Sequence, residues 1–330
     1  MTAQRTGSVP GKLMVAGEYA VLQPDGLALA VAVGRFVDWT VQPDAGPFQV
    51  AVTAFGETKL LSLSPAMPAP QGLPAFAHCA YVQAARAWSV APAGKLSLVV
   101  HGAVGGQKLG LGTSAAVTVA VLVAIAALTD RQPAPDAIAA VARAAHAQAQ
   151  AGEGSGYDVT TIACGGAVVY ARSPDRAEAV AWPADLAAVA LYTGQPAPTV
   201  DALRRRHAMA AALPRIRAAA ANVVDAWRAQ SDVLAALAAC DAALAYDNPV
   251  YAAIVTPSVV TAQQFLLAHG LVPRVSGAGG GDCVLGFGMA AAVDTAAAAW
   301  RAAGRLVVAE LPRDLAPRPV GHAPESFRGL

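Results

Sequence analysis

A lysine, two glycines and two hydroxyl residues stand close together in the stretch Lys108–Ala116, KLGLGTSAA. Glycines at positions 110 and 112 allow the backbone to approach an anion without a Cβ in the way. Thr113 and Ser114 suit the start of a helix, whose free N–H groups and positive dipole end attract phosphate. A hydroxyl at this place is also able to reach a magnesium ion held by that phosphate. The stretch therefore predicts an anion site at the start of a helix.

Two further glycine-rich turns, distant in sequence, each have an acidic residue nearby. The first is Gly154–Asp158, GSGYD, and the second is Ser276–Cys283, SGAGGGDC. Lysine is rare in this chain, yet Lys12 and Lys108 both adjoin glycine motifs. A compact ammonium suits such positions better than the larger guanidinium of arginine. Three such turns in one chain favour a phosphate-handling site over a set of ordinary tight turns.

Of two familiar nucleotide-binding motifs, a Walker A loop is absent from the Lys108–Ala116 stretch and a dinucleotide fingerprint is formally present. A Walker A loop places its lysine after the glycines, whereas Lys108 precedes them. The spacing Gly110-x-Gly112-x-x-Ala115 has the form of a dinucleotide fingerprint, and Asp130 follows about 20 residues later. That fingerprint normally opens a domain, but a mostly β segment precedes this one. Dinucleotide binding therefore stays an alternative that a titration with a nicotinamide cofactor would reveal.

Hydrophobic periodicity predicts the elements that position these turns. The expected strands lie in 9–22 and at 27–33, 37–41, 48–54, 95–101, 167–170, 187–192, 284–287 and 306–311. The expected helices are 75–88, 109–129, 135–150, 201–213, 215–228, 231–247, 256–269 and 290–303. Residues 65–74 are expected to form a loop, and Ser173–Pro183 the hinge region between the halves of the chain. Because strands and helices do not alternate strictly, the order favours an α+β fold over a doubly wound parallel sheet.

Composition limits the class of protein. The chain has 330 residues, 55% of them hydrophobic and 14% charged, which is typical of a compact globular protein with room for two domains. A net charge of +1 gives no excess of basic residues for binding nucleic acid, so we expect no nucleic-acid partner. The cysteines lack metal-ligand spacing and are expected to be reduced thiols: Cys79, Cys164, Cys240 and Cys283.

The sequence predicts a cytoplasmic protein without a membrane segment. The N-terminus, MTAQRTGSVPGK, lacks the apolar stretch of a secretory signal. Leu109–Thr129 is uncharged and about long enough to span a bilayer, so a membrane helix is an alternative there. Its first turn is polar and its flanks lack aromatic or clustered basic anchors, which favours a buried core helix.

The motifs together resemble the GHMP family of small-molecule kinases, and within it the phosphomevalonate kinases. The GEYAV form, the leading lysine of KLGLGTSAA and the Asp-Cys ending of SGAGGGDC are similar to that branch. The resemblance follows the family order and covers nearly the whole chain, in Pro10–Val21 (PGKLMVAGEYAV), Lys108–Ala116, Gly154–Val159 (GSGYDV), Thr193–Thr199 (TGQPAPT) and Ser276–Cys283.

The resemblance implies a two-domain α+β GHMP kinase fold. A ribosomal S5 domain 2-like N-terminal domain would cover residues 1–182, and a ferredoxin-like C-terminal domain 183–330, with ATP in the cleft between them and Mg²⁺ near Ser114. The implied catalytic residues are Asp158, Lys12 and Lys108. The implied ATP-binding residues are Lys108, Gly110, Leu111, Gly112, Thr113, Ser114 and Ala115. The implied acceptor-binding residues are Lys12, Glu18, Tyr19, Gly154, Ser155, Gly156, Ser276, Gly277, Ala278 and Gly279.

One position departs from the mevalonate kinases of this family. Those enzymes carry a glutamate about three helical turns before the catalytic aspartate, and it helps to bind Mg²⁺. The corresponding residue here is Ala147, with Gln148 and Gln150 nearby. Phosphomevalonate kinases also tend to lack this acid, so the departure agrees with that branch and leaves the Mg²⁺ ligands open.

The charge of the acceptor decides which groups matter most. Phosphoryl transfer passes through a loose transition state, so positioning and charge neutralisation carry most of the catalysis. An alcohol acceptor must lose a proton, and a carboxylate base helps. A phosphomonoester has a second pKa near ~6 and is largely deprotonated at neutral pH, so the site must bring two anions together. Lys12, Lys108 and Mg²⁺ would supply the necessary positive charge.

The expected activity is ATP-dependent phosphorylation of (R)-5-phosphomevalonate to (R)-5-diphosphomevalonate in the mevalonate pathway of isoprenoid biosynthesis, by a monomer or homodimer. The alternatives are a GHMP kinase that acts on an alcohol, such as mevalonate or a sugar, and a non-catalytic metabolite-binding regulator. Arg204–His207, RRRH, is expected to be a solvated helix face, although it could offer charge to a substrate phosphate. Asp282 is expected either to touch the substrate or to hydrogen-bond the glycine turn. The histidines form no sequence pattern, and we assign none of them a ligand role.

Overall fold

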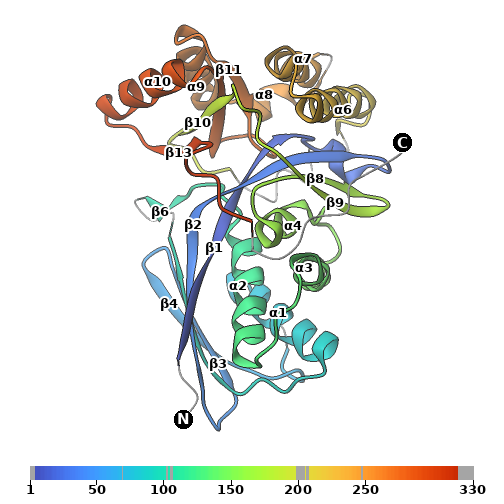
Figure 1. Ribbon diagram of the computed structural model, residues 1–330, viewed down its shortest axis with the longest axis vertical. Coiled ribbons are helices and arrows are strands. Elements are labelled where there is room, and N and C mark those ends of the chain that lie inside the picture. Colours follow the sequence, from blue (N-terminus) through green and yellow to red (C-terminus); the bar gives the residue numbers. More distant parts are fainter. Residues whose placement is uncertain are drawn as a thin grey trace. The chain divides into compact units, whose positions relative to one another are not determined.

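The chain forms two compact units, and each unit is assembled from separate segments (Figure 1). The computed structural model describes residues 4–68, 70–101, 103–104, 107–197, 205, 208–246 and 248–318. Within these bounds, unit 1 comprises residues 4–12, 32–165 and 316–318, and unit 2 comprises 13–31 and 166–315. Two long strands, β1 (Arg5–Ala16) and β2 (Leu27–Pro43), contribute residues to both units.

Unit 1 combines a sheet with a group of helices that carries two of the glycine turns. In chain order its further elements are β3 (Phe48–Ala54), β4 (Glu57–Leu63), α1 (Leu73–Trp88), β5 (Gly94–Val100), β6 (Ala103–Val104), β7 (Gln107–Lys108), α2 (Thr113–Leu128), α3 (Pro135–Ala149) and α4 (Tyr157–Cys164). The strand order is β4-β3-β5-β2, with β3 and β5 parallel and the other pairs antiparallel. Buried and exposed positions alternate along β5, so one face of the sheet is available to the helices. Helices α1, α2 and α3 pack against one another, and α2 contacts β5 (Figure 1).

Helix α2 lies in the core of unit 1. Its residues from Ala115 to Leu122 are all buried, and nearly all of them are apolar. A helix that is apolar on every side is stable only when protein surrounds it, which explains the long uncharged run after the first glycine turn. Across the described part of the chain, no helix has both the length and the apolar character needed to cross a membrane. The core-helix prediction for this stretch is confirmed.

Unit 2 is built around an antiparallel sheet in the order β11-β12-β10-β13. Helices α9 and α10 pack on this sheet, and its core includes Leu191, Val284 and Trp300. Beyond the shared strands, the elements of unit 2 are the 3-10 helix η1 (Ala20–Leu22), β8 (Ala167–Arg172), β9 (Asp175–Val180), β10 (Ala187–Tyr192), α6 (Leu213–Ala229), α7 (Val233–Ala245), α8 (Tyr251–Ile254), α9 (Pro257–Ala268), β11 (Val272–Val275), β12 (Cys283–Gly288), α10 (Ala290–Ala302) and β13 (Val307–Leu311).

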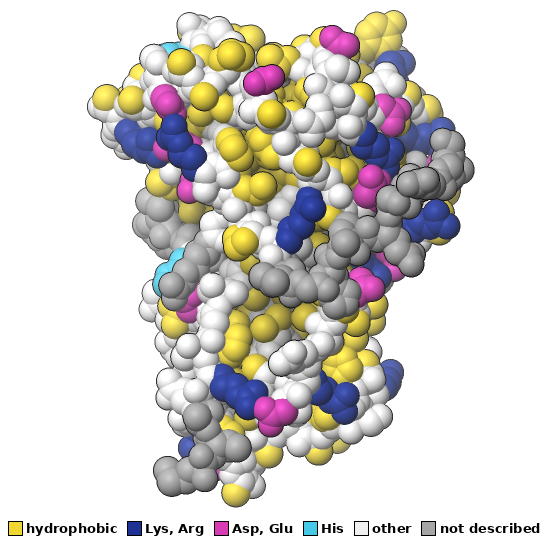
Figure 2. Space-filling model, viewed as in Figure 1, with side chains coloured by type: hydrophobic (Ala, Val, Ile, Leu, Met, Phe, Trp, Pro, Cys, Tyr) yellow, Lys and Arg dark blue, Asp and Glu magenta, His cyan; other side chains and the backbone are white. Residues whose placement is uncertain are grey.

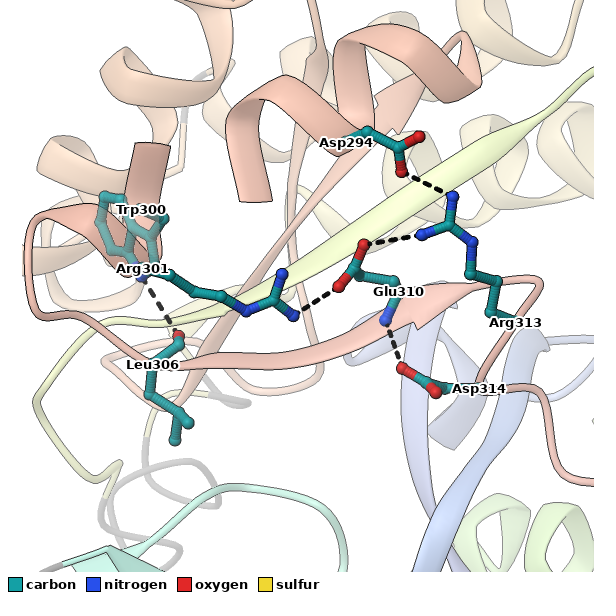
Figure 3. A network of polar contacts seen from close by, with 7 residues as sticks. All are labelled: Asp294, Trp300, Arg301, Leu306, Glu310, Arg313 and Asp314. Atoms are coloured by element: carbon teal, nitrogen blue, oxygen red, sulfur yellow. Dashed lines mark hydrogen bonds and ion pairs between the residues drawn. The ribbon is translucent and has the colours of Figure 1, made fainter. Parts of the chain in front are cut away.

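An ion-pair network ties α10 to β13 in unit 2 (Figure 3). Glu310, on β13, accepts from Arg301 and from Arg313, and Arg313 also pairs with Asp294 on α10 at 2.8 Å. The Asp314 carboxylate accepts the backbone N–H of Glu310 at 2.7 Å. The two arginine side chains are more than half exposed, so each pair contributes little alone and the network mainly fixes the edge strand against the helix.

Charged side chains do not gather into one patch on the face of the molecule seen in Figure 2. Basic and acidic side chains there are scattered among apolar and neutral ones. This distribution agrees with a net charge of +1 over 330 residues.

The predicted α+β class is confirmed, and three element predictions need correction. Residues 27–43 form one strand rather than two, because β2 pairs with β8 before Gly34 and with β5 after it. Strands β4 and β11 were not expected. The predicted hinge Ser173–Pro183 is wrong for most of its length: Asp175–Val180 is strand β9, hydrogen-bonded to β8 in a hairpin. Six of the thirteen residues of the predicted helix 201–213 lie outside the described residues, and 209–212 form a turn before α6.

Candidate active site

The first glycine turn ends at the N-terminus of α2, as expected. Gly110 and Gly112 have φ of +74° and +79°, in the left-handed region that favours glycine. Gly112 is the N-cap residue, and Thr113 and Ser114 form the first positions of the helix. The first amides of a helix have no acceptor within it, so this end of α2 offers N–H groups and a positive dipole end to an anion.

The side chain of Lys12 lies against this turn. Lys12 is 9% exposed, and its Nζ donates to the Gly110 carbonyl at 3.1 Å. Its backbone N–H donates to the Leu111 carbonyl at 2.9 Å. The lysine stem also fills the space beside Gly112, where a Cβ would lie 3.1 Å from Lys12 Cε. Two motifs almost a hundred residues apart therefore form one local structure in unit 1.

Lys108 ends strand β7, directly before the turn. Its backbone pairs with Ala103 in the two-stranded β6–β7 ladder, and its side chain is exposed. An exposed ammonium on this side of the turn is free to move on its flexible stem. Its expected contact with ATP stays a prediction.

Asp158 stands in the first turn of α4, after the second glycine-rich turn. Gly156, at φ +87°, is the N-cap of this helix. One carboxylate oxygen of Asp158, Oδ1, accepts the Val159 N–H at 2.9 Å. The side chain is 18% exposed, so solvent still reaches it. The Tyr157 ring lies beneath the Lys12 ammonium, 5.7 Å from Nζ to the ring centroid. Lys12 therefore lies next to the start of α4 as well as the start of α2.

His146 joins the starts of these two helices. It lies in the last turn of α3, and its side chain is 1% exposed. Its Nε2 is 3.2 Å from Ser114 Oγ and 3.8 Å from Asp158 Oδ2. His146 belongs to no sequence motif, and only its position next to Ala147, twelve residues before Asp158, distinguishes it from the other histidines.

The residues Gly154–Gly156 pass close to the end of α3. A Cβ at Gly154 would lie 2.2 Å from Gln150 Oε1 and 3.7 Å from His146 Nδ1. A side chain at Gly154 would therefore have to displace the end of the flexible Gln150 side chain. The second glycine-rich turn thus lies against the end of α3, and the predicted contacts of Gly154, Ser155 and Gly156 with an acceptor stay predictions.

Glu18 is fully buried in unit 2 and is ion-paired. It is 1% exposed, and its Oε2 accepts from Arg274 Nη2 at 2.8 Å. Arg274, which is itself 0% exposed, also lies 3.3 Å from Asp241 Oδ1. Burial raises the pKa of Glu18, and the Arg274 charge offsets part of that rise. The predicted contact of Glu18 with an acceptor stays a prediction, whereas its contact with β11 is a structural one.

Tyr19 contacts the third glycine turn, also within unit 2. Its hydroxyl donates to the Ala278 carbonyl at 2.6 Å. Burial raises the pKa of Tyr19 to about 12, although the nearby Arg205 charge acts in the opposite direction. Ser276 Oγ accepts the Met14 N–H and donates to the Met14 carbonyl, both at 3.0 Å. The turn that holds Ser276, Gly277, Ala278 and Gly279 is thus fixed to residues 14–19.

Asp282 and Arg205 also hold this third turn. Asp282, which follows the glycine turn, accepts the Ala197 N–H through Oδ1 at 3.0 Å and so connects the turn to the TGQPA segment. Arg205 is 9% exposed and donates to the Ala253 carbonyl at 2.5 Å, and its Nη1 lies 3.0 Å from where a Cβ at Gly280 would be. The predicted solvated helix face is therefore wrong for Arg205, because the side chain packs on the glycine turn. The other members of that run, Arg204, Arg206 and His207, lie outside the described residues, as do Pro198 and Thr199.

Two segments of the chain match models of one protein family. Residues 76–166 match the N-terminal domain of GHMP kinases, and residues 234–306 match the C-terminal domain of GHMP kinases. The chain belongs to the GHMP kinases. Members of this family are phosphotransferases that use ATP, and the first match contains both the α2 turn and Asp158. Because these kinases use ATP, membership of the family disfavours the dinucleotide alternative, and the ATP-binding role of Lys108–Ala116 stays a prediction. The predicted domain boundary at residue 182 stays a prediction.

Solved structures share the fold of this GHMP kinase. A phosphomevalonate kinase from Streptococcus pneumoniae, in complex with phosphomevalonate and AMPPNP, has a TM-score of 0.80 at 18% identity and covers 94% of this chain and 99% of its own. The Lin0012 protein from Listeria innocua has a TM-score of 0.78 at 20% identity, with 93% and 97% covered. A mevalonate kinase from Methanococcus jannaschii has a TM-score of 0.74 at 14% identity, with 93% and 98% covered. No curated protein sequence matches the chain.

Proposed function

We propose that this GHMP kinase transfers the γ-phosphoryl group of ATP to the phosphate of (R)-5-phosphomevalonate, giving (R)-5-diphosphomevalonate in the mevalonate pathway of isoprenoid biosynthesis. The observation that carries the proposal is the group of side chains around the start of α2. There, Lys12 Nζ donates a hydrogen bond to the Gly110 carbonyl of the turn at 3.1 Å, and His146 lies between Ser114 and Asp158. The GEYAV and GGGDC motif forms support the choice of acceptor, as does the likeness in fold to the Streptococcus pneumoniae enzyme.

The ATP phosphates are assigned to the turn at 110–115 and to the first amides of α2. A triphosphate bound there meets backbone N–H groups and the helix dipole, both of which stabilise negative charge. Lys12 presents a buried ammonium at the same turn, where the low local dielectric strengthens its attraction for an anion. Lys108 supplies a second, exposed ammonium from β7.

Asp158 has a smaller task with this acceptor than it would have with an alcohol. A phosphomonoester has a second pKa near ~6, so most of the acceptor needs no base at neutral pH. The main cost is the repulsion between two phosphates, which cations reduce. We therefore assign the larger contribution to Lys12 and Lys108, and to Asp158 the removal of the remaining proton.

The residues present fit Mg²⁺ shared with ATP. Ser114 and Asp158 offer a hydroxyl and a carboxylate, which are the oxygen donors Mg²⁺ prefers, and Mg²⁺ is usually held by one or two protein groups together with phosphates. Within the described residues, no cluster of three or more His, Cys, Asp or Glu side chains could hold an ion without such help. Mg²⁺, when bound, neutralises charge on the phosphates during transfer.

The acceptor-binding residues proposed in unit 2 surround the third glycine turn. Tyr19 and Ser276 hold the turn through hydrogen bonds, and Ser276 and Ala278 are its partly exposed residues. Arg205 places a guanidinium against Gly280, and we assign it to the acceptor phosphate because a guanidinium is well matched to phosphate oxygens.

Coupled measurement of ADP release tests the proposal. Purified protein with ATP and Mg²⁺ is offered phosphomevalonate, mevalonate, galactose and homoserine in separate assays. We expect turnover with phosphomevalonate only, and its loss when EDTA removes Mg²⁺. Turnover of mevalonate without phosphomevalonate would assign the protein to the alcohol kinases of the family. ATP that stays intact with every acceptor would instead support the non-catalytic alternative.

A further inference from the structure

The His146 side chain lies where three helices of unit 1 meet. Its ring is buried and tilted against Phe76 of α1, with ring centroids 5.0 Å apart. Of its two nitrogens, Nε2 faces Ser114 Oγ of α2 at 3.2 Å and Asp158 Oδ2 of α4 at 3.8 Å. A single buried nitrogen therefore faces the hydroxyl assigned to Mg²⁺ and the carboxylate assigned to the reaction.

The surroundings of the ring determine which nitrogen carries the proton. Among the described residues, His146 Nδ1 is buried and has no hydrogen-bond partner. A proton on Nδ1 would be a buried donor without an acceptor, which is costly. A proton on Nε2 points at two oxygens, of which the nearer is within hydrogen-bond distance. The neutral imidazole is therefore expected as the Nε2–H tautomer.

This tautomer constrains both oxygens that it faces. When Nε2–H donates to Ser114 Oγ, one lone pair of the hydroxyl is occupied and the remaining lone pair and the O–H must point elsewhere. The same N–H presents its positive end to Asp158 Oδ2, while Oδ1 is held by the Val159 N–H at 2.9 Å. Oδ1 is thus held by a hydrogen bond, whereas Oδ2 faces the positive end of the imidazole N–H at a distance longer than a hydrogen bond.

We propose that His146 is a positioning residue that sets the orientation of the Ser114 hydroxyl and of the Asp158 carboxylate relative to each other. The functional consequence rests on the proposed function, because that function assigns the tasks of Ser114 and Asp158. The tautomer and its hydrogen bond do not depend on that assignment. His146 itself touches neither substrate in this account.

Nitrogen-15 NMR of the histidine side chains tests the geometry without any assay of activity. In protein labelled at histidine, assigned by comparison with His146→Gln, we expect the His146 proton on Nε2. Substitution Ser114→Ala should shift the Nε2 resonance and leave Nδ1 nearly unchanged. A proton on Nδ1, or an Nε2 resonance indifferent to Ser114→Ala, would overturn the proposal.

Two substitutions of His146 test whether its position affects catalysis. They differ in where they place an amide group. The amide nitrogen introduced by His146→Gln reaches the region of Nε2, whereas His146→Asn places its amide near Nδ1. Because removing a group that orients a metal ligand typically costs 10–100-fold, we expect His146→Asn to lower kcat by about that factor with an unchanged KM for the acceptor. His146→Gln should retain kcat within about tenfold of wild type. Circular dichroism melting checks that both variants fold.

The outcomes separate this proposal from the proposed function. Kinetics are measured on whichever acceptor the wild-type protein phosphorylates. Equal kcat values for wild type, His146→Gln and His146→Asn would overturn the positioning role and leave the kinase function intact. A wild-type protein that phosphorylates no acceptor would overturn the proposed function, and the NMR result would then decide the His146 geometry alone.

Discussion

At the scale of single residues, positive charge at the first glycine turn is the property on which the proposed reaction depends. Lys12 and Lys108 are expected to offset the repulsion between ATP and a phosphorylated acceptor. Because loss of one group that stabilises transition-state charge costs about 100-fold or more, Lys12→Ala and Lys108→Ala should each lower kcat/KM by that amount. Asp158→Asn should lower it by no more than the lysine variants do.

Steady-state kinetics with phosphomevalonate measure these effects. Lys59→Ala, on the exposed part of strand β4, is the matched control and should leave kcat/KM unchanged. Lysine variants as active as wild type would remove the charge argument.

Gly112 is required both for its backbone conformation and for the space it leaves. An alanine there would adopt φ near +79°, which costs about 1–2 kcal/mol. Its Cβ would lie only 3.1 Å from Lys12 Cε and would displace the lysine side chain. Because small misplacements of a positioned group cost about 100-fold in rate, we expect Gly112→Ala to lower kcat/KM by that order.

Gly152→Ala is the control for Gly112→Ala, measured by the same kinetics and by urea unfolding. Gly152 has φ +85° with open space at its Cβ, so this variant has the backbone cost alone. It should lose about 1–2 kcal/mol of stability and keep its activity. Equal kinetic losses in the two variants would show that contact with Lys12 is unimportant.

The buried Tyr19 hydroxyl predicts a pH dependence of stability. Burial raises the Tyr19 pKa from 10.0 to about 12, so the unfolded chain loses this proton first and the folded state loses stability as pH rises through that window. Between about pH 9 and about pH 11.5, Tyr19 should therefore account for a fall of about 2 kcal/mol in the free energy of unfolding.

Urea unfolding of wild type and Tyr19→Phe at both pH values isolates this contribution, since the other tyrosines are present in both proteins. At the lower pH, Tyr19→Phe should be about 1 kcal/mol less stable, because the hydrogen bond to Ala278 is lost. That deficit should disappear or reverse at the higher pH. A constant difference across the range would contradict the buried, neutral phenol.

Residue types and motifs predicted which side chains to examine, but not their partners. Lys12, Ser114 and Asp158 stand out because glycines and an acid at fixed spacing suggest phosphate chemistry. His146 has no motif, since its relation to Ser114 and Asp158 comes from the packing of α2, α3 and α4. The pairing of Glu18 with Arg274, on a strand far along the chain, has the same origin.

At the scale of elements, the Glu18–Arg274 ion pair connects the turn at 17–19 to strand β11. Both side chains are almost fully buried, so removing Arg274 leaves the Glu18 charge uncompensated, and removing Glu18 leaves Arg274 with only the longer contact to Asp241 at 3.3 Å; losses of this kind cost about 3–5 kcal/mol. We expect Glu18→Leu and Arg274→Met each to lose about that much stability, and the double variant to lose much less than the sum.

A double-mutant cycle by urea unfolding measures this coupling. Arg217→Met removes an exposed ion pair with Asp25 of the neighbouring turn and should cost less than about 1 kcal/mol. Additive losses for Glu18→Leu and Arg274→Met would mean that the pair does not connect these elements.

Elements with strong periodicity could be predicted from the sequence, and those defined by pairing could not. Helices α2, α3 and α10 begin and end near their predicted residues, because apolar spacing and flanking turns are local signals. Strand β9 lies in the segment predicted to be a hinge, because its side chains are partly exposed and only its hydrogen bonds to β8 make it a strand. Strand β4 likewise has mostly exposed side chains and no apolar alternation that would predict it.

At the scale of the whole molecule, the order of motifs along the chain does not correspond to the order of the compact units. The GEYAV segment belongs to unit 2 although Lys12, a few residues earlier, belongs to unit 1. Strands β1 and β2 cause this division, because each is long enough to run from one unit into the other. A prediction that divides the sequence into two consecutive domains cannot foresee a chain that passes between the units in this way.

The central claim is that the acceptor is itself a phosphate ester. The most direct measurement is phosphorus-31 NMR of one reaction that contains the protein, ATP, Mg²⁺ and equal amounts of mevalonate and phosphomevalonate. We expect phosphomevalonate to be consumed as ADP forms. Two mutually coupled phosphorus signals of a new diphosphate ester should appear. If mevalonate is the acceptor instead, the uncoupled monoester signal of phosphomevalonate should grow as ADP forms, and no diphosphate ester should appear. That result would contradict the proposed reaction.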